Sequence, residues 1–129
     1  MTEVPQSDSN IPILSEEARQ RLLKVSTPTI ATLLYKHGYK NAYIQGVSSL
    51  NSPGTRLVGP AFTLRYIAAR EDTDPLTEFR KPDHPQRLAV ETCPEGHVLV
   101  MDCRQDASAA SAGSILLTRL EVRGVAGCV

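Results

Sequence analysis

The last third of the chain constrains the fold most, because two apolar runs flank one helical pattern. Residues 97–103, HVLVMDC, form a largely apolar run of strand length, which is typical of a strand buried on both faces. Small residues follow at 107–114, then a helical apolar pattern over 115–122 and a second apolar run over 125–129. This order predicts a β-α-β unit at 97–129, with two parallel strands and a right-handed crossover. The fold class is therefore α/β.

The first part of the chain predicts an arm and two helices. Residues 1–13 are polar and lack periodicity, so we expect a flexible amino-terminal arm. Ser15 can cap a first helix, and two glutamates follow it at the positive end of the helix dipole. Thr27 is the expected cap of a second helix, with a proline at its first position and Gly38 at its end.

The middle of the chain predicts a long strand and then a charged loop. Residues 56–67 have strand character, and Gly59-Pro60 within them predicts a bulge or an edge position, because proline cannot donate to the ladder. His84-Pro85 begins a further helix after the loop. We expect residues 14–129 to form one α/β domain.

Four side chains in that loop have the chemistry of metal ligands. They are Asp72, Asp74, Asp83 and His84. The same residue types also serve as helix caps and as solvated loop residues, and we favour that interpretation over a metal site.

Charge balance and hydropathy indicate which classes of binding partner are not expected. The 129 residues carry 14 Lys and Arg against 14 Asp and Glu, which argues against a broad basic footprint for nucleic acid or anionic lipid. No apolar run approaches the roughly 20 residues of a membrane span. The three cysteines are an odd number without a C-x-x-C pair, which favours buried thiols in a reducing, cytoplasmic setting. We predict neither nucleic acid nor membrane as a partner.

The loop after the predicted strand at 97–103 is the candidate binding site. Ligands of open α/β sheets lie beyond the carboxyl ends of parallel strands, where helices begin. The free amides around Gly113, Ser114, Ile115 and Leu116 would favour an anion there, a small carboxylate or phosphate. The alternative is a tight strand-to-helix connection that packs against a neighbour. No phosphate-loop pattern with a Gly-Lys pair is present, so nucleotide binding is not expected.

Two carboxylates border this loop. Asp102 and Asp106 stand at its start, with Arg104 between them. A carboxylate at the end of a strand can be a general base or a metal ligand. It can also cap the loop, and we favour this supporting role for Asp102.

The order and spacing of four segments resemble the RraA-like family. That family includes 4-hydroxy-4-methyl-2-oxoglutarate aldolases with oxaloacetate decarboxylase activity, and the regulator of ribonuclease E activity. The similarity extends from about Leu22 to Val129. It rests on the segments GTRLVGPAFT at 54–63, PEGHVLVMD at 94–102, AGSIL at 112–116 and RGVAG at 123–127.

The resemblance implies a layered fold of the swivelling β/β/α type and a homotrimer with sites between subunits. It implies a divalent-metal-dependent lyase, with magnesium or manganese, that cleaves or decarboxylates small α-keto acids to give pyruvate. The amides at Gly113, Ser114, Ile115 and Leu116 would hold the pyruvate end of the substrate. The alternative within the family is a non-enzymatic regulator that binds and inhibits ribonuclease E.

The sequence departs from the family pattern in two places. Family aldolases usually carry an acidic residue after the glycine, where this chain has Ser114. The Arg-Asp pair, whose arginine binds substrate and whose aspartate anchors the metal, is expected beyond Val129. We therefore predict an incomplete domain with no metal ligand of its own, and no catalysis by these 129 residues alone.

Overall fold

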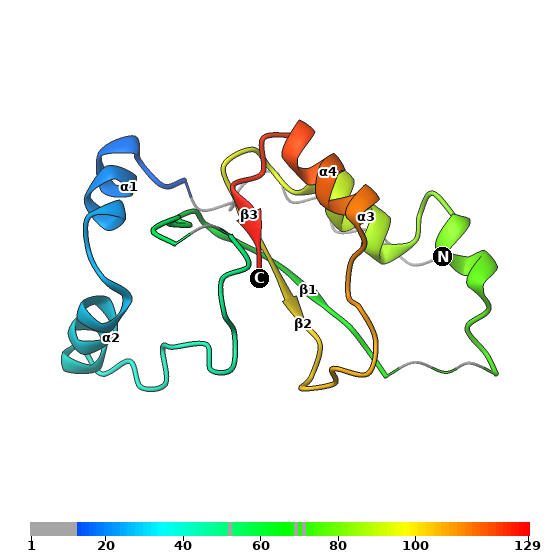
Figure 1. Cartoon of the computed structure of the whole chain (residues 1–129), viewed down its shortest axis with the longest axis horizontal. Coiled ribbons are helices and arrows are strands. Elements are labelled where there is room, and N and C mark those ends of the chain that lie inside the picture. Colours follow the sequence, from blue (N-terminus) through cyan, green and yellow to red (C-terminus); the bar gives the residue numbers. More distant parts are fainter. Residues whose placement is uncertain (1–12, 52, 69, 71) are drawn as a thin grey trace.

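The structure is a computed structural model, and it describes residues 13–51, 53–68, 70 and 72–129. The predicted arm lies outside these residues apart from its last position. None of the helices in these ranges combines the length and the apolar character that crossing a bilayer requires. The elements in chain order are α1 (Glu16–Leu23), α2 (Thr27–Lys36), β1 (Ala61–Arg65), the 3₁₀ helix η1 (Leu76–Arg80), α3 (Pro85–Thr92), β2 (Val98–Asp102), α4 (Ser114–Val122) and β3 (Gly127–Cys128) (Figure 1).

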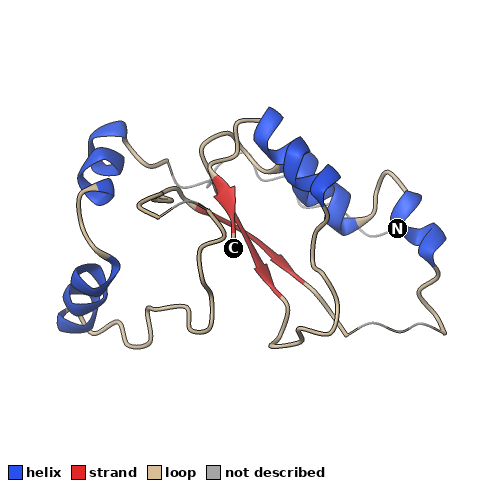
Figure 2. Ribbon diagram, in the orientation of Figure 1, coloured by secondary structure: helices blue, strands red, loops and turns tan. Residues whose placement is uncertain are grey.

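The three strands form one parallel sheet in the order β1-β2-β3. Ala61 of β1 lies opposite Val98 of β2, and Val98 lies opposite Gly127 of β3. Helix α4 connects β2 to β3, so the predicted parallel β-α-β unit is confirmed, with β2 as the central strand (Figure 2). The molecule is an α/β protein.

Strand β1 is shorter than the predicted run of 56–67. It begins only after Pro60, whose carbonyl oxygen accepts a hydrogen bond from the Val98 amide at 2.9 Å. Gly59 lies so close to β2 that a Cβ there would collide with the carbonyl oxygen of Gly96. Within the described sheet β1 is an edge strand, the position expected for a strand next to a proline.

The core lies between the sheet and helices α3 and α4, which run along one of its faces (Figure 1). Side chains alternate along a strand, so Leu99 points into this core while Val98 lines the other face. Cys93 at the end of α3 is fully buried, and burial raises the pKa of its thiol. The buried cluster comprises Ala89, Val90, Cys93, Leu99, Leu120 and Val125.

The opposite face of the sheet lines an apolar groove. It has a volume of about 330 Å³ and is bordered by Leu22 of α1, Ile30 of α2 and Val98 of β2, among others. The Arg56 guanidinium also donates to the carbonyl oxygen of Val25 at 2.9 Å. These contacts connect the amino-terminal helices to the sheet, yet no residue within 13–51 is buried.

Local signals set the ends of the two amino-terminal helices. Ser15 caps α1 as predicted, since its Oγ accepts a hydrogen bond from the Ala18 amide at 3.2 Å. Helix α2 is capped by Ser26 rather than by the predicted Thr27, which is already its first residue. Gly38 follows α2 with φ +88°, the left-handed conformation that glycine adopts most readily.

Candidate functional site

The candidate site begins where β2 ends at Asp102. Arg104 and Gln105 have φ of +54° and +65°, which is uncommon for residues other than glycine and turns the chain sharply. The Asp102 carboxylate accepts hydrogen bonds from the Arg104 amide at 2.9 Å and from Arg65 Nε at 3.0 Å. The Arg104 amide, and to a smaller extent Arg65, lower the pKa of Asp102. This carboxylate therefore links the ends of β1 and β2 to the first turn of the loop.

Two side chains hold the far part of the loop through hydrogen bonds to a single backbone carbonyl group. The Ser111 oxygen accepts hydrogen bonds from the Tyr66 hydroxyl at 2.7 Å and from Gln86 Nε2 at 2.6 Å. Gln86 Nε2 also donates to the Tyr66 hydroxyl at 3.0 Å. Burial raises the pKa of Tyr66, so its hydroxyl keeps the proton that it donates. These contacts tie the start of α4 to the segment after β1 and to the first turn of α3.

Sequence reasoning missed Tyr66 and Gln86. They are 45 and 25 residues away from Ser111 in the chain, so no local spacing links them to the loop. Only the packing of α3 beside the sheet brings them to the same carbonyl group.

The first turn of α4 presents its amides without a side-chain cap. Gly113 is the N-cap residue, and the first hydrogen bond of the helix runs from the Leu117 amide to the Gly113 oxygen at 3.1 Å. Helix geometry leaves the amides of Ser114, Ile115 and Leu116 without a partner inside the helix. Gly113, Ser114 and Ile115 are exposed. The four predicted residues thus lie together in one turn open to solvent, and their role in binding substrate stays a prediction.

Gly113 is not required by the packing of the chain itself. Its φ of −104° suits any residue, and a Cβ placed there would meet no atom within 4 Å. Gly59 is the contrast, because a Cβ there would strike the backbone. The open space in front of Gly113 lets a ligand approach the helix start closely.

A family model described as RraA-like, Aldolase/RraA, matches residues 27–129. The chain belongs to the RraA-like family. The match confirms the resemblance and includes the candidate site, whereas α1 lies outside it. Comparisons with curated proteins and with solved structures gave no match.

The RraA-like resemblance implies a divalent metal, and the described residues do not fit one. Asp102 is already bonded to Arg65 and to the Arg104 amide. Asp106 accepts a hydrogen bond from the Ser108 amide at 2.9 Å. Across 13–51, 53–68, 70 and 72–129, no group of three or more His, Cys, Asp or Glu side chains could hold a metal ion. No metal ligand is therefore assigned within this part of the chain.

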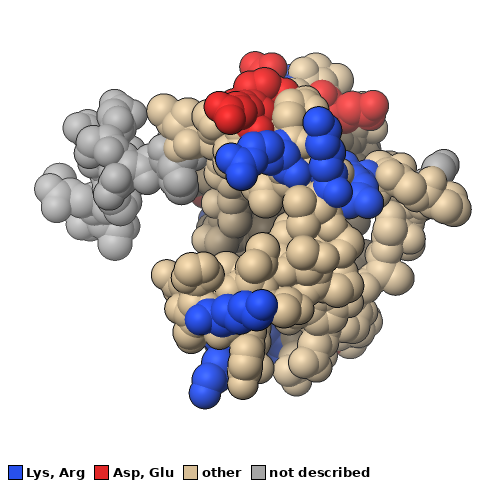
Figure 3. All heavy atoms as spheres, turned by 90° about the vertical axis from the view of Figure 1, so that its left-hand side faces the viewer, with Lys and Arg blue, Asp and Glu red and all other residues tan. Residues whose placement is uncertain are grey.

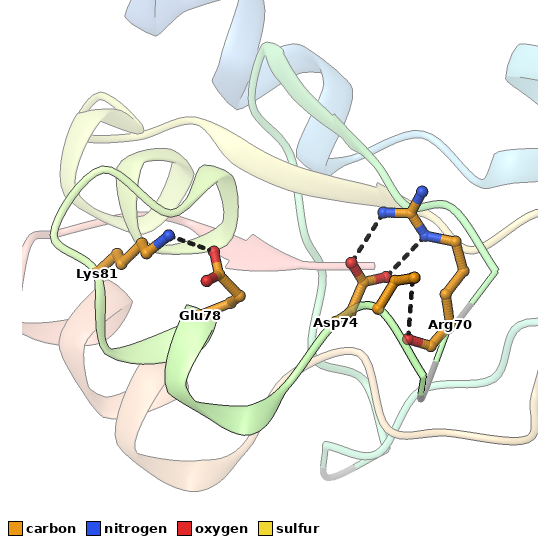
Figure 4. A network of polar contacts seen from close by, with 5 residues as sticks. Arg70, Asp74, Glu78 and Lys81 are labelled. Carbon is orange, nitrogen blue, oxygen red and sulfur yellow. Dashed lines mark hydrogen bonds and ion pairs between the residues drawn. The ribbon is translucent and has the colours of Figure 1, made fainter.

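The charged loop after β1 carries ion pairs and a helix cap. Asp74 binds the Arg70 guanidinium through both oxygens, at 2.9 and 2.8 Å (Figure 4). His84 is the N-cap residue of α3, where its Nδ1 accepts from the Gln86 amide at 3.3 Å. These contacts agree with the predicted loop-and-cap interpretation of the segment.

Proposed function

We propose that this RraA-like chain supplies the substrate-binding amides of a lyase that acts on small α-keto acids. The reaction is retro-aldol cleavage of 4-hydroxy-4-methyl-2-oxoglutarate or decarboxylation of oxaloacetate, either of which gives pyruvate. The observation that carries the proposal is the uncapped, exposed first turn of α4, held in place through Ser111. Membership of a family described as Aldolase/RraA supports the reaction class.

The amides of α4 suit the charges of such a substrate. An α-keto acid carries a carboxylate next to its ketone, and both reactions leave the electrons of the broken bond as an enolate. Amides at a helix start carry partial positive charge, so they favour a carboxylate and a developing oxyanion. In this proposal Ser114 contributes its amide only, because its hydroxyl is no general base at neutral pH.

Further features of the proposal come from the resemblance. They are a homotrimer and dependence on magnesium or manganese, whereas the proposed cytoplasmic location comes from the cysteine pattern. A metal would polarise the ketone oxygen of the substrate. Its ligands would come from outside the described residues, and the proposal gives no metal-binding role to Asp102.

Ser114→Pro tests the amides directly. Ser114 is the first helical residue, where proline is tolerated, and the extended Gly113, with ψ 172°, suits a residue before proline. The variant removes one amide hydrogen and leaves the helix intact. A hydrogen bond to a charged group contributes about 1.5–3 kcal/mol. We therefore expect the KM for oxaloacetate to rise roughly ten- to hundredfold.

The control is Ser114→Ala, which keeps the amide and removes the hydroxyl. We expect it to leave KM within about twofold of the wild type. Pyruvate release is measured with the complete natural gene product, with and without EDTA. Loss of activity on chelation supports the metal-dependent lyase. Equal KM values for the two variants would exclude substrate binding by this amide, and no pyruvate release with any divalent metal would favour the ribonuclease E regulator.

A further inference from the structure

The zero net charge of the chain conceals a strong segregation of charge. No Asp or Glu occurs between Glu17 and Glu71, whereas this stretch contains eight Lys and Arg residues. Those eight cations are Arg19, Arg21, Lys24, Lys36, Lys40, Arg56, Arg65 and Arg70. At physiological salt a charge is felt over only about 8 Å, so the local balance decides what a surface attracts.

Four of these cations are exposed and form no ion pair with a described residue. They are Arg21 and Lys24 at the end of α1, and Lys36 and Lys40 at and after the end of α2. Arg19, Arg65 and Arg70, by contrast, are paired with carboxylates. Figure 3 faces the side on which α1 and α2 lie; blue side chains form one group near the top, beside red ones, and a second group lower down, with uncharged surface between them.

Three exposed aromatic rings alternate with two of these cations. Tyr35, Tyr39 and Tyr43 follow one another at intervals of four residues and are 65%, 65% and 56% exposed. Lys36 and Lys40 stand beside them in the chain. None of the three rings stacks on another aromatic side chain of the described residues. We call these five residues the tyrosine–lysine segment.

We propose that the tyrosine–lysine segment binds single-stranded nucleic acid. The cations attract phosphates, and the rings offer flat surfaces on which bases stack, a combination typical of single-strand binding. An uncharged protein partner would leave the cations unpaired. An acidic peptide or an anionic membrane would satisfy the cations but has no bases for the rings. The proposal departs from the sequence-based prediction of no nucleic-acid partner, which rested on net charge alone.

The first test is salt-dependent binding of a fluorescein-labelled, mixed-sequence 20-nucleotide RNA or DNA, followed by fluorescence anisotropy. On a single strand, each phosphate contact contributes about 0.7 to the slope of log K against log salt. The double variant Lys36→Gln, Lys40→Gln should therefore reduce the steepness of this slope by about 1.4. The matched control, Arg80→Gln with Arg87→Gln, removes two exposed cations elsewhere and should leave the slope unchanged.

The second test separates stacking from charge. Tyr39→Leu and Tyr43→Leu keep apolar area but remove the rings, and each should weaken binding about tenfold. All the substituted positions are exposed, so the fold should survive. Three outcomes would overturn the proposal: no binding at low salt, binding unaffected by the tyrosine variants, or equal competition by polyglutamate or phosphatidylglycerol vesicles.

Discussion

Helices α2 and α4 of this RraA-like chain are both delimited by local sequence signals, but only α4 buries an apolar side chain. Helix α2 begins at a serine cap and carries an apolar stripe, yet Leu33 in that stripe is 50% exposed. Helix α4 has no side-chain cap, yet its Leu120 is only 3% exposed. The difference is that α4 packs on α3 beside the sheet, whereas α2 only borders an open groove. Capping and periodicity thus set where a helix begins and ends, but burial requires a partner surface.

Ion pairs also join helices α3 and α4 in the carboxyl-terminal region. Glu91 of α3 accepts two hydrogen bonds from the Arg119 guanidinium of α4, at 2.9 and 2.8 Å, and Arg123 lies 3.7 Å from the same carboxylate. The pairs are half-exposed, so they orient the two helices and add little stability. The same elements share the buried apolar cluster, and burial of apolar surface is the dominant favourable term in folding.

The largest expected effect is that of Leu99→Ala. Leu99 is 1% exposed at the centre of the core, so its truncation leaves a cavity and should lower the free energy of unfolding by about 2–5 kcal/mol. Leu33→Ala makes the same change in α2 and should cost no more than about 0.5 kcal/mol. Urea denaturation of both variants measures the difference. Equal losses would mean that α2 is buried in solution.

The second-largest loss of stability is expected for Gly59→Ala. A Cβ at this position strikes the Gly96 carbonyl group, so β1 and β2 must separate, at a cost of about 1–3 kcal/mol. Gly113→Ala is the control: the space there is open, so we expect only the cost of replacing glycine by alanine at an N-cap, about 0.5–1 kcal/mol. Thermal unfolding compares the two. A large loss for Gly113→Ala would contradict the open approach to the candidate site.

A smaller and local effect is expected at the start of α2. Ser26 Oγ accepts a hydrogen bond from the Thr29 amide at 3.4 Å, so Ser26→Ala should lower the local stability of this helix by about 1 kcal/mol. Amide hydrogen exchange in α2 should accelerate, while the exchange of β2 stays unchanged. Thr27→Ala, at the cap expected from the sequence, should have a smaller effect. A larger effect would mean that Thr27, and not Ser26, caps α2 in solution.

The smallest effect concerns pH. The hydrogen bonds from Arg119 lower the pKa of Glu91 below its ordinary value of 4.5. The contribution of this pair to stability is therefore present above about pH 4.5 and is lost as pH falls through the lowered pKa. In urea denaturation between about pH 6 and about pH 3, Glu91→Gln should show a slightly shallower loss of stability than Glu121→Gln. Glu121 forms no ion pair within the described residues, so identical pH profiles would show that the Glu91 pair has no effect.

Helix caps were predictable from the sequence, whereas contacts between distant segments were not. The caps of α1 and α3 were correctly predicted from Ser15 and His84-Pro85, because a cap depends on neighbours within a few residues. The strand predicted from residue 56 begins only at Ala61. The close approach of Gly59 to Gly96 just before it is a contact between distant segments, which the local pattern does not reveal. The supports of the loop at Tyr66 and Gln86 were missed for the same reason.

The sequence by itself determined that the end of the chain is a parallel β-α-β unit, because strand length, helical periodicity and small loop residues are properties of consecutive residues. It also placed an uncapped helix start after β2. Only the tertiary structure decided which face of that helix is buried, which side chains hold its loop, and which cations near α1 and α2 have no ion pair with another described residue. Those outcomes depend on distances between residues far apart in the chain, which local pattern does not encode.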